Sequence, residues 1–212
     1  MSIDIVMMTL GMVQTNAYLV ADTSTGNALL IDPVDDANAI LDIAADRGWQ
    51  ICLILATHAH FDHVLAAKAI KDATGAPFIA HRDSVPWLER LPEQGMRFGL
   101  GRFPEAPPVD RLIGDEPEMI ALDAIQLKTL YTPGHADGHL AFYMPDHAVV
   151  FSGDTLFQGS IGRTDLPGGS YERLIHSIET QLLTLPDETR VLSGHGQPTT
   201  IGAERRTNPF LA

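Results

Sequence analysis

The 212-residue sequence predicts an α/β protein in which two sheets pack together and helices lie outside them. Three observations predict this fold class. Strand-like runs and helical segments alternate in both halves of the chain. The run ICLILA at 51–56 is apolar throughout, which is typical of a strand buried on both faces. Several runs end in a turn that contains Gly or Pro, so the strands are short and well bounded.

The N-terminal half begins with strand-like runs separated by turn-forming residues such as DTSTG. A helix follows, because Asp35 and Asp36 precede apolar residues at helical spacing and Gly48 comes just after them. The histidine-rich segment after the apolar run leads into a second helical pattern. The expected strands are 3–10, 16–22, 27–32, 51–56 and 76–81, and the expected helices are 36–48, 64–75 and 83–91.

Residues 92–117 are expected to form a long loop within the domain. The segment contains five prolines, at positions 92, 104, 107, 108 and 117. Long loops in compact domains often cover or form binding sites. The second half then resumes the alternation of strands and helices. Its expected strands are 118–123, 125–132, 140–145, 148–153 and 190–194, and its expected helix is 171–185.

Charge and cysteine content exclude several classes of function. The formal net charge is −13, and no long basic run appears, so the chain lacks the clustered Lys and Arg that bind nucleic acid. The acidity favours cations, including metal ions. The single cysteine, Cys52, lies inside an apolar run and fits a reducing compartment. No apolar run reaches membrane-spanning length and no basic residue precedes the first one, so a cytoplasmic protein without membrane contact is expected.

The stretch ATHAHFDHV at 56–64 gathers four side chains that can bind metal, directly after the buried strand. His58 and His60 are two positions apart, so an extended backbone points both the same way. Asp62 and His63 follow after the chain turns and can face a second ion. Polar groups are costly in such a place unless something binds them. The cluster therefore predicts a metal site.

Three further residues, His135, Asp154 and His195, each follow an apolar strand in a Gly- or Pro-containing turn: YTPGH, VVFSGD and VLSGH. Ligands at the ends of several strands converge at one rim of a sheet. Taken singly, each of the three would be a helix cap or a solvated group, but their shared strand-then-turn context favours a common site. The remaining histidines are expected to be structural or solvated, namely His81, His139, His147 and His176. Seven His and Asp ligands exceed the four of one tetrahedral zinc and suit two ions that share a carboxylate.

The order HxHxDH, TPGH, GD and GH resembles that of the metallo-β-lactamase fold hydrolases over nearly the whole chain. GDTLFQGSIGRTDLPGG and the NPFL tail resemble the short (type II) glyoxalase II, or hydroxyacylglutathione hydrolase, group. The resemblance implies an αββα sandwich of two mixed sheets with outer helices. It also implies metal roles for seven residues. The first-ion ligands are His58, His60 and His135, the second-ion ligands are Asp62, His63 and His195, and the bridging carboxylate is Asp154.

The same resemblance implies a hydrolase of S-acyl thioesters, with S-lactoylglutathione as the expected small-molecule substrate. Its cofactors would be two divalent ions, zinc first, with iron or manganese possible. Asp62 and Asp154 would hold the metal-bound hydroxide that acts as nucleophile. A single domain over 1–212 is expected, without the C-terminal helical domain that helps longer glyoxalase II enzymes bind glutathione. The β-lactamases differ by a Cys or Ser at the position of Asp154.

Two other functions stay open. In a mononuclear iron persulfide dioxygenase, His58, His135 and Asp154 would form the triad that binds the ion. A non-catalytic metal-binding protein is disfavoured by the seven ligands. Four residues have open roles in holding the substrate or supporting the site loops: Arg163, Arg205, Arg206 and Asp32. Arg163 is expected to pair with an acid such as Asp165, and Asp32 either caps the helix at 36–48 or supports the histidine segment.

Overall fold

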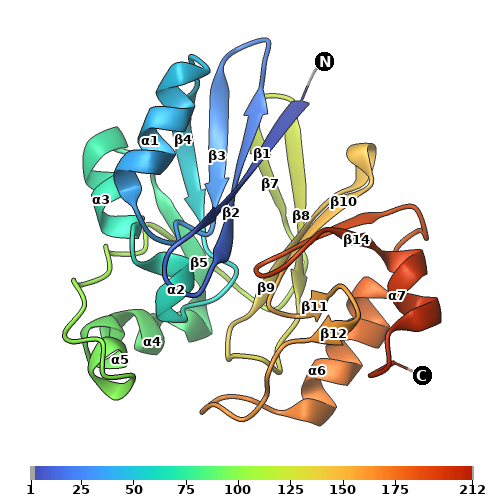
Figure 1. The fold of residues 1–212 in the computed structure, drawn as a ribbon. Coiled ribbons are helices and arrows are strands. Elements are labelled where there is room, and N and C mark those ends of the chain that lie inside the picture. The colour runs from blue at the N-terminus through green and yellow to red at the C-terminus, as the bar shows by residue number, and fades with distance from the viewer. Residues whose placement is uncertain (1–2, 212) are drawn as a thin grey trace.

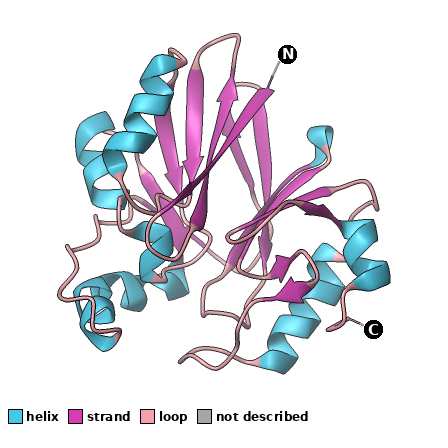
Figure 2. Ribbon diagram, in the orientation of Figure 1, coloured by secondary structure: helices cyan, strands magenta, loops and turns pink. Residues whose placement is uncertain are grey.

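Two six-stranded mixed sheets face each other, and helices cover their outer faces (Figures 1 and 2). The computed structural model describes residues 3–211. The fold class expected from the sequence, an αββα sandwich, is confirmed. The N-terminal sheet holds the blue-to-green part of the chain in Figure 1, and the yellow-to-red part forms the second sheet.

The N-terminal sheet runs in chain order, with antiparallel pairs among its first three strands and parallel pairs among the rest. Its strands are β1 (Ile3–Leu10), β2 (Thr15–Asp22), β3 (Asn27–Ile31), β4 (Gln50–Leu55), β5 (Phe78–His81) and β6 (Arg111–Ile113). The parallel strands are joined by helical crossovers, which place helices on the outer face.

The second sheet has the order β14-β13-β10-β9-β8-β7, and in it only β10 and β13 pair in parallel among the described strands. Its strands are β7 (Met119–Leu122), β8 (Ile125–Tyr131), β9 (Leu140–Met144), β10 (Val149–Gly153), β13 (Arg190–Ser193) and β14 (Thr199–Thr200). A small hairpin, β11 (Leu156–Phe157) and β12 (Ser160–Ile161), forms a separate two-stranded sheet that packs beside β10 and β13.

The helices are short. They are α1 (Ala37–Asp46), α2 (Phe61–Val64), α3 (Ala67–Thr74), α4 (Val85–Glu89), α5 (Leu91–Arg97), α6 (Tyr171–Ser177) and α7 (Ile201–Thr207). Single turns add the 3₁₀ segments η1 (Arg82–Ser84) and η2 (Pro145–His147), and a π-helical turn η3 (Ile178–Leu182) follows α6. The Asp36 side chain caps α1 by accepting a hydrogen bond from the Ala39 amide at 3.2 Å.

Three apolar layers hold the sandwich together, and the period of two along each strand divides residues between them. On β3, Leu30 faces the outer helices, whereas Leu29 and Ile31 face the second sheet. On β10, Val150 packs toward α6 and Phe151 packs between the sheets. Strands buried on both faces need apolar residues on both, which explains the continuous apolar runs in the sequence.

Three sequence expectations about elements are wrong in part. The helix expected at 64–75 is shorter, because α3 begins only at Ala67; the separate helix α2 ends at Val64, and 65–66 lie between the two. The segment 92–117, expected to be a loop, contains α5, which continues from the helix expected at 83–91, and the strand β6. The helix expected at 171–185 becomes a π-helical turn after Ser177 and ends at Leu182.

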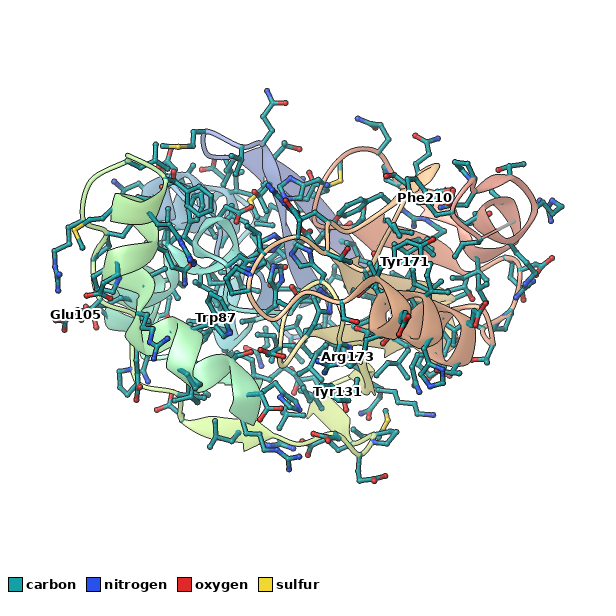
Figure 3. The ribbon with its side chains drawn as sticks, turned by 90° about the horizontal axis from the view of Figure 1, so that it is seen from below. Trp87, Glu105, Tyr131, Tyr171, Arg173 and Phe210 are labelled. Carbon is teal, nitrogen blue, oxygen red and sulfur yellow. The ribbon has the colours of Figure 1, made fainter. Side chains whose placement is uncertain are left out.

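The helices α4 and α5 lie together at one end of the N-terminal sheet, near β5 (Figure 1). Seen from below, Trp87 points from α4 toward the middle of the molecule, where the two halves meet (Figure 3). Tyr171 and Phe210 lie on the other half. None of the helices within residues 3–211 is long and apolar enough to span a membrane.

Candidate metal centre

Residues from four separate segments meet at one end of the sandwich. The histidine segment follows β4 and enters α2, His135 lies between β8 and β9, Asp154 follows β10, and His195 follows β13. Backbone hydrogen bonds fix these strand ends to one another. The Leu140 amide donates to Thr57 O at 2.8 Å, and the Gly194 amide donates to Gly153 O at 2.8 Å. The convergence expected from the strand-then-turn pattern is therefore present.

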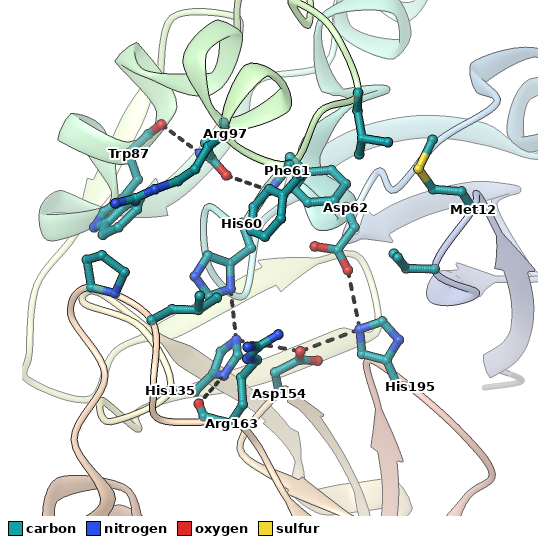
Figure 4. A pocket seen from close by; sticks show the side chains of 16 residues that line it. Met12, His60, Phe61, Asp62, Trp87, Arg97, His135, Asp154, Arg163 and His195 are labelled. Atoms are coloured by element: carbon teal, nitrogen blue, oxygen red, sulfur yellow. Dashed lines mark hydrogen bonds and ion pairs between the residues drawn. The ribbon is translucent and has the colours of Figure 1, made fainter.

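The first group of side chains consists of three buried histidines. His60 Nδ1 lies 3.0 Å from His58 Nε2 and 2.8 Å from His135 Nε2. His135 Nδ1 lies 2.8 Å from the carbonyl oxygen of Arg163, which can only accept, so the proton is on Nδ1 and the Nε2 lone pair faces the cluster (Figure 4). This arrangement offers three nitrogen ligands to one point.

The second group consists of Asp62, His63 and His195. Asp62 Oδ2 lies 3.5 Å from His63 Nε2 and 3.3 Å from His195 Nε2. Thr15 Oγ1 donates to the same carboxylate oxygen at 2.8 Å. All three ligand atoms lie within 4.8 Å of one another, so this group can also hold an ion.

Asp154 lies between the two groups. Its Oδ1 lies 3.4 Å from His63 Nε2, and its Oδ2 lies 3.5 Å from both His135 Nε2 and His195 Nε2 (Figure 4). Neighbouring ligands of a tetrahedral zinc with bonds of 2.0–2.1 Å are about 3.3–3.4 Å apart, which matches these separations. Within residues 3–211, His63 Nε2 and Asp154 Oδ1 face each other in the cluster and are buried without a hydrogen-bond partner. The donor set therefore fits divalent cations.

Asp32 resolves one of the sequence alternatives. Its Oδ2 lies 2.8 Å from His63 Nδ1 and accepts a hydrogen bond from Thr57 Oγ1 at 2.8 Å, while its Oδ1 accepts from the Thr57 amide at 2.7 Å. The helix α1 is capped by Asp36 instead. Asp32 thus supports the histidine segment and fixes the proton of His63 on Nδ1.

His139 is buried and holds the backbone at Asp154. Its Nε2 accepts a hydrogen bond from the Asp154 amide at 3.0 Å, and its Nδ1 lies 2.9 Å from Thr132 Oγ1. The ring also stacks against His58, with centroids 4.9 Å apart. The sequence predicted that His139 is either structural or solvated. The side chain is fully buried, so its role is structural.

The close packing of the centre depends on a glycine. A Cβ atom on Gly194 would lie 2.2 Å from Asp154 Oδ1 and 2.6 Å from His63 Cε1. Both neighbours are buried, and the His63 ring is held by Asp32. The glycine of the SGH turn therefore lets β13 approach the cluster, and any larger residue would displace a candidate ligand.

The two groups differ in protonation when no cation is present. Burial lowers the pKa of His60 to about 3, so this imidazole is neutral and ready to bind metal. Burial acts in the same direction on His63 and His195, but the carboxylates of Asp154 and Asp62 prevail. They raise the pKa of His63 well above its usual value and that of His195 to about 10. Protons thus balance the carboxylates where a cation can bind.

A cavity of about 490 Å³ opens onto the cluster. Its volume is that of a small-molecule site. The cluster forms its floor, α5 and the following turn form one wall, and the β1–β2 turn forms another. The lining residues are Met12, Val13, His60, Phe61, Asp62, Trp87, Gln94, Arg97, Phe98, Leu100, His135, Asp154, Arg163, Leu166, Pro167 and His195 (Figure 4).

The three arginines singled out in the sequence lie in different places. Arg163 lines the cavity and forms a two-bond pair with Asp165, Nε to Oδ1 and an Nη to Oδ2, both 2.7 Å. Arg205 and Arg206 lie on α7 and pair with Asp187, away from the cavity lining. The structure therefore does not bring these two to the site, and they hold α7 against the preceding loop.

Several residues at the site carried no signal in the sequence. Gln94 is buried on α5, Thr15 binds Asp62, and Trp87 lies edge-on to His60 with ring centroids 6.0 Å apart. None of them follows the strand-then-turn pattern that identified the ligands. The other histidines are outside the cluster: His81 is buried against Tyr131, and His147 and His176 are exposed.

The sequence is similar to that of known proteins over most of its length. A family model described as the metallo-beta-lactamase superfamily matches residues 10–195. The hydroxyacylglutathione hydrolase GloC of Haemophilus influenzae is 42% identical over 199 residues, which are 93% of each chain. The family match includes every segment that contributes to the cluster.

Solved structures show the same architecture. The BLEG-1 B3 metallo-beta-lactamase has a TM-score of 0.93 and 39% identity, and the match covers 99% of this chain and 100% of that one. TTHA1623 in a di-iron-bound form has a TM-score of 0.86 and 44% identity, with 97% and 100% covered. ETHE1 from Myxococcus xanthus has a TM-score of 0.81 and 27% identity, with 97% and 83% covered.

Proposed function

The chain belongs to the metallo-β-lactamase superfamily, and from this premise we propose that it is a dinuclear metal-dependent hydrolase of S-acyl thioesters. The proposed substrate is S-lactoylglutathione or a close relative. Members of this superfamily are metal-dependent hydrolases, and one relative of 42% identity is a hydroxyacylglutathione hydrolase. The reaction class is thus that of the superfamily, and the thioester is the specific proposal.

The observation that carries the proposal is the position of Asp154 between two complete ligand groups. Its two oxygens approach His63 on one side and His135 on the other, at 3.4 and 3.5 Å. A carboxylate in that position can be shared by two cations. A single ion would leave either His58, His60 and His135 or Asp62, His63 and His195 without a role.

The protein's own side chains prepare this centre for cations. Arg163 O and Asp32 bind the outer nitrogens of His135 and His63, so that the inner nitrogens are the ones left to bind a cation, which at His63 would take the place of a proton. Thr15 fixes the Asp62 carboxylate from outside the group. Two bound divalent ions would supply a water of lowered pKa and polarise the thioester carbonyl. No Ser or Cys nucleophile is needed.

We propose zinc as the metal, because imidazole and carboxylate ligands with near-tetrahedral separations suit it. Iron and manganese accept the same ligands, and TTHA1623, 44% identical, is a di-iron form. The metal content per chain is the direct test. Protein dialysed against each metal should retain two ions per chain, measured by elemental analysis. Retention of one ion at most would overturn the dinuclear proposal.

The reaction is tested by thioester loss without oxygen. Zinc- or manganese-loaded protein should cleave S-lactoylglutathione anaerobically, with release of one thiol per thioester. Two comparison reactions belong in the same experiment. A β-lactam is one, because BLEG-1, a B3 metallo-beta-lactamase, matches with a TM-score of 0.93. Glutathione persulfide with iron-loaded protein in an oxygen electrode is the other.

The outcomes separate the candidates. Anaerobic thioester cleavage well above cleavage of the β-lactam supports the proposal. Oxygen uptake with persulfide, combined with no thioester cleavage in any metal form, would establish a persulfide dioxygenase that uses His58, His135 and Asp154. Cleavage of the β-lactam alone would move the proposed substrate from thioesters to amides.

A further inference from the structure

We propose that Arg97 binds a carboxylate on the thiol portion of the substrate, so that the cavity selects thioesters of acidic thiols. The inference rests on the proposed function, because it concerns the same cavity. It adds a specificity residue on α5, in the segment whose sequence predicted only a loop. Four features of the cavity support it.

The first feature is the position of Arg97. It is the last residue of α5 and lines the wall of a cavity that has His60, Asp62 and Asp154 at its floor. In the close-up, the Arg97 side chain runs from α5 toward the side of the cavity where Trp87 lies (Figure 4). A substrate whose acyl carbon reaches the cluster extends from the floor past this wall.

The second feature is that the Arg97 guanidinium is free to bind an anion. Within residues 3–211 it has no hydrogen-bond or ion-pair partner. The other arginine of the lining, Arg163, already binds both oxygens of Asp165 at 2.7 Å. The planar guanidinium matches a carboxylate with two parallel hydrogen bonds. Of the two arginines at the cavity, Arg97 is the one that retains this capacity.

The third feature is that α5 is fixed to the metal-binding segment by Gln94. The side-chain amide of Gln94 donates to Ala59 O at 3.0 Å and to Trp87 O at 3.1 Å, and its oxygen accepts from the Phe61 amide at 3.0 Å. Gln94 is buried, and Arg97 follows it by three positions, about one helical turn. The position of Arg97 is therefore tied to the histidine segment.

The fourth feature is the contrast between Arg97 and its surroundings. The walls near it are apolar, with Trp87, Phe98 and Leu100 on the α5 side and Met12 across the cavity. Phe98, Leu100 and Met12 are exposed at 46%, 39% and 62%, which is high for such residues. A ligand with an apolar middle and an anionic end would cover these side chains and neutralise the arginine. Charge pairing is strengthened where a ligand excludes water.

The experiment compares Arg97→Gln with Arg102→Gln, a matched control. Arg102 is exposed five residues further along and pairs with Glu93 outside the cavity lining. Two thioesters with the same lactoyl group are used, one of glutathione and one of neutral N-acetylcysteamine. Arg97→Gln should raise KM for the glutathione thioester about tenfold and leave the neutral thioester within about twofold. Arg102→Gln should behave as the unchanged protein, and Arg97→Lys should recover part of the loss.

A binding measurement makes the test independent of turnover. Calorimetry with S-methylglutathione, which cannot be hydrolysed, and with its dimethyl ester measures the carboxylate contribution directly. The unchanged protein should prefer the acid, and Arg97→Gln should remove about tenfold of affinity for the acid alone. Equal affinity of Arg97→Gln and the unchanged protein for the acid would overturn the role of Arg97. Selective binding without hydrolysis of either thioester would keep that role and overturn the proposed reaction.

Discussion

Replacement of Asp32 by Asn should weaken metal binding, although the two side chains have nearly the same size and shape. Three donors converge on the two carboxylate oxygens of Asp32: the Thr57 amide at 2.7 Å, and Thr57 Oγ1 and His63 Nδ1 at 2.8 Å each. Asparagine offers one oxygen and one NH2 group. The backbone of Asp32 has a φ of 53°, which Asn also adopts readily, so the substitution adds no backbone strain.

Either orientation of the new amide leaves a conflict. If its oxygen accepts from the Thr57 amide, its NH2 group faces His63, whose proton must then move from Nδ1 to Nε2. His63 Nε2 would become a donor and could no longer bind a cation beside Asp62 and Asp154. The reverse orientation leaves the buried Thr57 amide facing the NH2 group. Loss of such outer support costs about 10–100-fold in metal affinity.

The loss of charged hydrogen bonds should also lower the free energy of unfolding of the metal-free protein by about 2 kcal/mol. For a chain of this size that corresponds to a fall in Tm of about 6 °C. The assays are equilibrium dialysis against buffered zinc and thermal unfolding with chelator. Asp36→Asn is the matched control, because Asn caps a helix as well as Asp does. Two zinc ions bound by Asp32→Asn with unchanged affinity would refute the reasoning.

Three further predictions concern the centre and its loop. Asp154→Asn removes the charge between the two ligand groups, so elemental analysis should find fewer than two ions per chain and kcat should fall on the order of 100-fold or more. Arg163→Gln removes the exposed pair with Asp165 in the loop where the Arg163 carbonyl oxygen accepts a hydrogen bond from His135. The value of kcat/KM should therefore fall by the same factor for acidic and neutral thioesters, and a selective loss on the acidic one would instead assign Arg163 to substrate binding. For the chelated protein, the pKa of about 10 for His195 exceeds its unfolded value near 6.5, so its contribution to stability is complete below pH 6.5 and is lost toward pH 10. Thermal unfolding should show this fall in Tm without metal and a much flatter profile with metal, and a pH-independent Tm of the chelated protein would contradict it.

The strands and the segments that carry the candidate ligands could be predicted from the sequence, because burial of a strand determines both its composition and the position of the turn that follows it. A strand buried on two faces must be apolar throughout, and the chain must turn where it ends. The turns YTPGH, VVFSGD and VLSGH therefore indicated strand ends at His135, Asp154 and His195, and the structure brings all three together. The pattern did not depend on any contact distant in sequence, so a single chain was enough to reveal it.

The α5 segment could not be predicted, because its apparent helix breakers are accommodated by tertiary structure. Pro92 occupies the first turn of α5, where its missing amide proton has no partner to lose. Gly95 lies against the following turn, where a Cβ would come within 2.3 Å of Gly101 O. Both residues read as loop formers in isolation. The sequence also could not decide whether Asp32 caps the helix or supports the histidine segment. Only the fold shows that Asp32 lies beside His63 and that Asp36 caps α1.

These two outcomes separate the determinants of metal binding from those of substrate choice. The candidate ligands are placed by the ends of sheet strands, whereas the α5 wall of the cavity is tied to the histidine segment by the buried side-chain amide of Gln94. Substitutions in the wall can therefore change the substrate without disturbing the metals. In a chain that keeps the seven His and Asp side chains, the choice among thioesters is accordingly expected to depend on wall residues such as Arg97 and Phe98.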